Sequence, residues 1–135
     1  MSSIKDLKLA QKAANEQLQV ISELKALVAD IERCEKTILG LKQELEIVNS
    51  RHQGRRTTRE DIAYLTALLE CAKKKLAWEK QIASLQKRTP QLLERMSKLI
   101  HDPQNPPTEE SRNDMLGSLH AVQAAMERLQ GVKTD

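Results

Sequence analysis

The sequence predicts an all-α protein: a long antiparallel helical hairpin (coiled coil) with a third C-terminal helix that packs on its base or on a partner. Tyr64 and Trp78 are the only aromatics among 135 residues, and glycine and proline number four each. A β or α/β domain usually needs more aromatic core residues and more turns. Leu, Ala, Lys, Glu and Gln are abundant, which is typical of long helices. Apolar residues also recur in alternating steps of three and four, which predicts seams, rows of side chains facing a neighbouring helix.

The first helix is expected over about residues 3–50 of a single helical domain, 1–135. This stretch contains no proline and one glycine, Gly40. The predicted seam comprises Ile21, Leu24, Val28, Ile31, Cys34, Ile38, Leu41, Leu45 and Val48. Its three-residue step between Ile31 and Cys34 follows another step of three, which indicates a local stammer. A helix of about 70 Å is too long for one compact core, so we expect it to lie along another helix.

A basic tip loop is predicted at residues 51–57. Gly54 suits the left-handed conformation that ends a helix, and Thr57 with Glu60 has the spacing of a capping box that starts the next one. Such a short loop returns the chain antiparallel. If the chain folds about Gly54, residues whose numbers add up to about 108 lie opposite one another, which places Cys34 near residue 74.

The second helix is expected over about 58–101 and contains two rows of apolar residues. The first row is Ile62, Leu65, Leu69, Ala72 and Leu76, and the second is Trp78, Ile82, Leu85, Thr89, Leu92, Met96 and Leu99. The change of phase after Leu76 would meet the stammer at Cys34, as expected of a genuine hairpin. Pro90 predicts a kink at 89–90, or a new helix with Thr89 as its N-cap.

A proline-rich loop at 102–107 precedes a third helix, expected over about 108–130 and ending near Gly131. Its seam is Met115, Leu119, Val122, Met126 and Leu129. The first half of the first helix is apolar over more than one seam, which suits two neighbours. We therefore expect the third helix to run beside it, with the alternative that it binds another subunit.

The sequence contains no motif for catalysis, so we expect no enzyme, no cofactor and no metal site. His52, His101 and His120 stand alone, without the spacing that metal ligands need. Cys34 and Cys71 are interpreted as small apolar seam residues. Because no apolar segment is long enough to span a bilayer and no secretory signal is evident, we expect no membrane insertion and an intracellular location, cytoplasmic or nuclear.

The favoured function is a non-enzymatic scaffold or adaptor subunit that assembles with other helical proteins as a homo- or hetero-oligomer. Cytoskeletal, kinetochore and vesicle-tethering complexes all use such parts, and the residues do not choose among them. Leu39 and Ile47 lie off the predicted seam, and Trp78 is of the residue type that dominates binding hot spots. The candidate partner-binding residues are Leu39, Ile47, Trp78, Met115, Leu119, Val122 and Met126. A helical export escort or chaperone is a further hypothesis.

The tip supports a second hypothesis, an anion-binding hairpin. Residues 51–59 carry four arginines and no acid, and a local positive charge attracts an acidic protein surface or nucleic acid. Nucleic acid is less favoured because no aromatic side chain for base stacking lies nearby. The candidate residues are Arg51, Arg55, Arg56 and Arg59, and their alternative role is a solvated, solubilising loop. Thr58 follows an Arg-Arg-Thr stretch and is a candidate phosphorylation site at a helix N-terminus.

Overall fold

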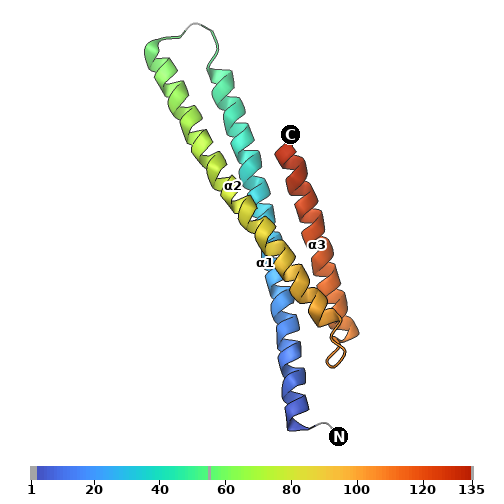
Figure 1. Ribbon diagram of the computed structural model, residues 1–135. Coiled ribbons are helices and arrows are strands. Elements are labelled where there is room, and N and C mark those ends of the chain that lie inside the picture. Colours follow the sequence, from blue (N-terminus) through green and yellow to red (C-terminus); the bar gives the residue numbers. More distant parts are fainter. Residues whose placement is uncertain (1–2, 55, 135) are drawn as a thin grey trace.

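The structure is a computed structural model that describes residues 3–54 and 56–134. It contains three helices, α1 (Ile4–Arg51), α2 (Thr58–Ile100) and α3 (Glu109–Thr134), and no strand within the described residues. Helices α1 and α2 form a long antiparallel hairpin, and α3 lies beside α1 (Figure 1). This arrangement confirms the all-α hairpin, and it places the third helix on α1 within the same chain.

Each helix begins at a side chain that accepts a hydrogen bond from the free backbone N–H groups of the first turn. Ser3 caps α1 and forms a full capping box with Asp6, which the sequence analysis did not identify. The Thr57 hydroxyl accepts from the Glu60 N–H at 3.2 Å, and Thr108 accepts from Ser111 at 3.1 Å. These caps fix the three starts.

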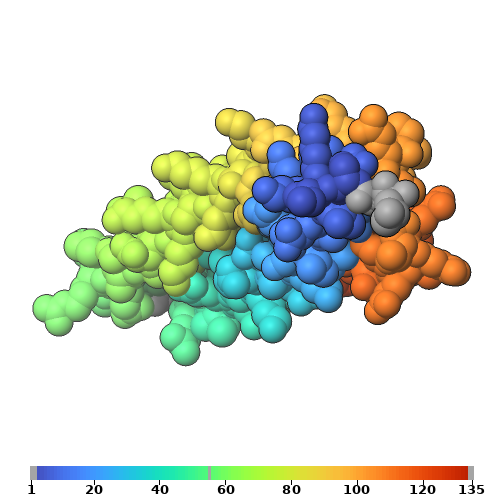
Figure 2. All heavy atoms as spheres, turned by 90° about the horizontal axis from the view of Figure 1, so that it is seen from below, coloured from blue at the N-terminus to red at the C-terminus, as the bar shows by residue number. Residues whose placement is uncertain are grey.

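Two regions of the hairpin differ in their number of layers. We define the base as α1 residues 17–42, which lie between the contacts of Gln17 with Ser111 and of Lys42 with Val132, together with α2 residues 77–100 and α3. The arm comprises α1 residues 43–51 and α2 residues 58–76, and α3 does not extend along it (Figure 1). Viewed from below, the start of α1 lies between the end of α2 and the start of α3 (Figure 2). Helix α1 packs extensively on both other helices, whereas α2 and α3 scarcely meet.

The seam of α1 is one unbroken heptad pattern, so the predicted stammer is wrong. Its buried members are Ala13, Gln17, Val20, Leu24, Leu27, Ile31, Cys34, Ile38 and Leu41, and the half-buried Leu45 and Val48 continue it. The steps alternate strictly between four and three. The predicted stammer results from placing Ile21 and Val28 in the seam. The seam positions are Val20 and Leu27, each one residue earlier.

The predicted change of phase in α2 is wrong for the same reason. The row that faces α1 comprises Tyr64, Leu68, Cys71, Trp78, Ile82, Leu85, Thr89, Leu92, Met96 and Leu99. It keeps one heptad register from the arm to the base, interrupted only by the exposed Lys75. The row Ile62 to Leu76, which was expected to face α1, points outward instead.

The register of the hairpin also differs from the prediction. Interhelical ion pairs join Glu44 to Lys74 at 2.8 Å and Asp30 to Arg88 at 3.0 Å, so opposite residue numbers add up to 118 rather than 108. Cys34 therefore lies at the level of Ile82 and Leu85, not of residue 74. Because α2 ends level with about residue 18 of α1 instead of about residue 8, the first turns of α1 project beyond the base (Figure 1).

Helix α3 runs parallel to α1 along the base. The Ser111 hydroxyl donates to Gln17 Oε1 at 2.8 Å, and Lys42 donates to the Val132 carbonyl near the other end. Helix α3 continues through Gly131 to Thr134 instead of ending near 130.

Helix α2 is continuous at residues 89 and 90, where a new helix was one of the two predictions. It passes through Pro90, and the Thr89 hydroxyl donates to the Leu85 carbonyl at 2.7 Å, so Thr89 is not an N-cap.

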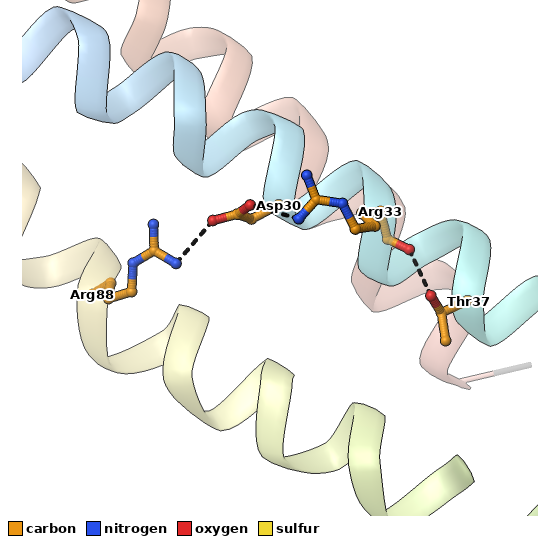
Figure 3. A network of polar contacts seen from close by, with 4 residues as sticks. All are labelled: Asp30, Arg33, Thr37 and Arg88. Atoms are coloured by element: carbon orange, nitrogen blue, oxygen red, sulfur yellow. Dashed lines mark hydrogen bonds and ion pairs between the residues drawn. The ribbon is translucent and has the colours of Figure 1, made fainter.

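Polar side chains line one edge of the α1–α2 interface, with acids on α1 and bases on α2. Besides the two ion pairs above, Glu23 meets Arg95 at 2.5 Å. Asp30 accepts from both Arg88 and Arg33, each at 3.0 Å, which makes it the centre of a small network (Figure 3). In all three of these interhelical ion pairs, therefore, an acid of α1 faces a base of α2.

Candidate interaction surface

The most distinctive surface feature is an apolar row on the arm that no other helix covers. We call it the outer stripe; its members are Ile62, Leu65, Leu69, Ala72 and Leu76. The four large side chains are between 56% and 62% exposed, and Ala72 is exposed as well. Their steps of three, four, three and four are those of a coiled-coil seam. The outer stripe therefore has the spacing of a helix-packing row but is exposed.

The outer stripe faces outward because the arm has two apolar rows and only one neighbour. Tyr64, Leu68 and Cys71, in the row facing α1, each precede a member of the outer stripe by one residue. One residue corresponds to about 100° around a helix of 3.6 residues per turn, so α1 covers one row and leaves the other in solvent. Helix α3 packs on α1 and not along the arm of α2.

Basic residues border the outer stripe on one side. Arg59, Lys73 and Lys80 are spaced by multiples of seven, which places them at one heptad position (e) beside the stripe, and all three are exposed. Lys73 lies 3.4 Å from Glu70 on its own helix. Arg59 and Lys80 form no ion pair with any residue that the structure describes.

The tip of the arm is closed by a compact polar cluster. The rings of His52 and Tyr64 stack with centroids 3.5 Å apart and planes 2° from parallel, and the Tyr64 hydroxyl donates to Asn49 Oδ1 at 2.8 Å. These two rings, with Val48 and Arg51 among their neighbours, line a shallow groove of about 310 Å³. Gly54, with a φ of 84°, turns the chain between the two helices.

The tip arginines do not form one free basic patch. Arg56 Nε lies 3.0 Å from Asp61 Oδ1, and Arg56 Nη1 donates to the His52 carbonyl at 3.3 Å, so this side chain closes the loop. Arg51 and Arg59 are exposed, while Arg55 lies outside the described residues.

Thr58 is the first residue of α2 and is exposed. Its proposed phosphorylation stays a prediction.

The structure divides the predicted partner-binding residues between surface and core. Leu39 and Ile47 are 44% and 50% exposed. In contrast, Met115 and Val122 are fully buried in the core shared with α1, which removes them from the surface. Leu119 and Met126 are half-buried and pack against the same core. On α3 the prediction therefore selected residues that already have a partner within the chain.

Trp78 lies in the row that faces α1 and is half-buried against the core. Its indole nitrogen is buried and has no hydrogen-bond acceptor among the described residues. The ring thus acts mainly as packing for the base, not as an exposed anchor.

The ionisable and nucleophilic groups form no reactive cluster among the described residues. Cys34 and Cys71 are both free and buried, and burial raises the pKa of the Cys34 thiol, with a smaller opposing effect from Lys133. No group of three or more His, Cys, Asp or Glu side chains in the described part of the chain could hold a metal ion. None of the described helices is long and apolar enough to cross a membrane.

No protein-family model, curated protein or solved structure matches this chain significantly.

The outer stripe is the feature that sequence reasoning missed. The sequence pattern places its residues in the seam that faces α1. The signal that could have found it is the overlap of two apolar rows, because Tyr64, Leu68 and Cys71 each directly precede a member of the outer stripe. One neighbouring helix cannot cover both.

Proposed function

We propose that this protein is a non-enzymatic helical adaptor, a scaffold subunit of an intracellular complex that binds another subunit through the outer stripe. The observation that carries this proposal is that Ile62, Leu65, Leu69 and Leu76 keep seam spacing while remaining more than half exposed. Complexes of the cytoskeleton or the kinetochore contain helical subunits of this kind and are examples of the complex that we propose.

The energetics support a covering partner. Full burial of a leucine or isoleucine side chain contributes roughly 1.5–3 kcal/mol, so covering the exposed part of four members of one row favours association. Isolated apolar residues are common on protein surfaces and need no explanation. A contiguous row with seam spacing differs, because it is the pattern that a second helix covers by knobs-into-holes packing.

The test is affinity capture from the native source with three forms of the full chain. The stripe variant, Leu65→Gln with Leu69→Gln, replaces two exposed members of the outer stripe. The matched control is Leu18→Gln, at a position on α1 that is 66% exposed. Circular dichroism should show the same helical content for all three. We expect the wild type and the control to retain the same subunit and the stripe variant to lose it.

Two results would contradict the adaptor function. One is the recovery of the same proteins by the wild type and the stripe variant. The other is a purified chain that sediments as a stable monomer at micromolar concentration and never co-purifies with a partner. A chain with Arg51 and Arg55 replaced by Ser separates this function from the anion-binding hypothesis, because it keeps Arg59 beside the outer stripe and the pair between Arg56 and Asp61. Capture should persist for an adaptor and collapse for an anion-binding tip.

A further inference from the structure

We propose that the outer stripe binds one amphipathic helix of another protein, and that this helix carries acidic residues along the edge of its apolar face. The inference rests on the proposed adaptor function and adds the chemistry of the partner. It follows from the length of the stripe, from the charges beside it and from the ion pairs between acids of α1 and bases of α2.

The stripe has the dimensions of a two-heptad helix contact. From Ile62 to Leu76 it extends over 14 residue steps, or about 21 Å at 1.5 Å per residue. Below Leu76 the next heptad position is Glu79, which is charged and exposed. A partner helix of about four turns would thus cover the whole apolar row of the arm.

The charges beside the stripe select an acidic partner. Residues at heptad positions e and g flank the apolar face and form the interhelical ion pairs that set partner choice. Position e holds Arg59, Lys73 and Lys80 besides the neutral Thr66, and position g holds Lys75 besides Asp61 and Leu68. The acid at position g, Asp61, is engaged by Arg56 at the tip. The edges available to a partner are therefore predominantly basic.

The hairpin itself pairs bases with acids in this way on the other edge of α2. There, Lys74, Arg88 and Arg95 each meet an acid on α1, at 2.8, 3.0 and 2.5 Å. The partner helix would repeat on the outer side what α1 does on the inner side.

The same charges disfavour a second copy of this chain as the occupant. In an antiparallel self-pairing, e positions face one another and Arg59 would oppose Lys80; in a parallel one, Lys75 would oppose Lys80. The exposed apolar residues at the start of α1, Ile4 and Leu7, lie among lysines at 5, 8 and 12. The acid between them, Asp6, is engaged in the capping box with Ser3. Like charges at such positions are destabilising.

The experiment uses two labelled three-heptad helical peptides with leucine at a and d. One carries Glu and the other Lys at e and g, and fluorescence anisotropy at nanomolar peptide follows binding to the full chain at low salt. We expect the Glu peptide to bind at least about tenfold more tightly than the Lys peptide, and its binding to weaken as salt rises. The stripe variant should lose binding, and Leu18→Gln should keep it.

Charge reversal with Lys73→Glu and Lys80→Glu supplies the decisive comparison. These exposed positions should leave the helical signal unchanged while the preference moves to the Lys peptide. Equal binding of both peptides, an unchanged preference after reversal, or no binding of either peptide would overturn the inference. A dimer of the purified chain that the stripe variant converts to monomer would overturn it in favour of a second copy. If a native subunit depends on Leu65 and Leu69 but ignores the reversal, the adaptor function stands and only the acidic partner is refuted.

Discussion

The base and the arm of the hairpin share one pair of seams but bury them to different depths. In the base, α1 has α2 on one side and α3 on the other, and Leu24, Leu27 and Ile31 are completely buried. In the arm, the seam residues Leu45 and Val48 are only half-buried. The difference shows that two helices cannot exclude water from a seam as well as three.

Polar and ring contacts join the two helices at the end of the arm. The stacked rings of His52 and Tyr64 and the pair between Arg56 and Asp61 hold the tip together. Such exposed interactions contribute little free energy each. We therefore regard the base as the main source of the stability of the fold and the arm as its less stable part.

The largest expected difference comes from placing the same charge in each region. Leu27→Asp buries a carboxylate without a partner in the base and should destabilise the fold by more than about 4 kcal/mol. Leu65→Asp, on the outer stripe, should change the free energy of unfolding by less than about 0.5 kcal/mol. Thermal unfolding followed by circular dichroism measures both. Equal effects of the two substitutions would refute the distinction between base and arm.

The two free cysteines test the same distinction without a change in sequence. Cys34 in the base and Cys71 in the arm are almost equally buried, so alkylation requires local opening. We expect Cys71 to react about tenfold faster at neutral pH, because the arm opens at lower free energy. Burial also raises the pKa of Cys34, which lowers its thiolate fraction. Mass spectrometry of the labelled protein gives both rates.

The cysteine experiment needs the unfolded chain as its reference. In concentrated urea the two thiols should react at similar rates. Native labelling that is faster at Cys34 than at Cys71 would reverse the proposed order of stability.

A smaller effect is expected from the ion pair between Asp30 and Arg88, which ties α2 to α1 in the base. Both side chains are partly exposed, so a double-mutant cycle with Asp30→Ala and Arg88→Ala should give a coupling of about 0.5–1 kcal/mol. Urea unfolding at low and high salt measures it. The pair between Glu94 and Lys98, which lies within one helix, serves as the comparison, and a larger coupling there would contradict the interhelical role.

The smallest effect concerns Lys74 and Glu44 in the arm. The hydrogen bond from the Lys74 ammonium to Glu44 raises the Lys74 pKa above its ordinary 10.5. The folded state therefore holds this proton more tightly than the unfolded state. The stabilisation is complete below the ordinary pKa and is lost as the pH rises through the raised value. The difference in urea midpoint between wild type and Lys74→Met should shrink from pH 8 to about pH 11.5, and a constant difference would count against it.

Helix positions were predictable from the sequence to within a few residues, because the signals for them are local. Thr57 starts α2 through its own hydroxyl, and Gly54 supplies the left-handed turn before it. The end of α3 was less predictable, since a glycine such as Gly131 does not stop a helix whose next turn still packs.

The candidate site was only partly predictable. Leu39 and Ile47 were correctly expected to lie off the seam, whereas Met115 and Val122 were taken from a row that packs inside the chain. Apolar spacing reveals that a residue needs a neighbour, but not whether the neighbour belongs to the same chain.

By itself, therefore, the sequence determined three helices, the Thr57 cap and a hairpin, because hydrogen bonds and 3.6-residue periodicity act within a few residues. The tertiary structure decided which of two overlapping rows on α1 and α2 turns inward. Tyr64 and Leu65, or Leu27 and Val28, satisfy the local spacing equally well. The choice depends on the apolar area buried along the whole base, where α1 must serve two helices at once.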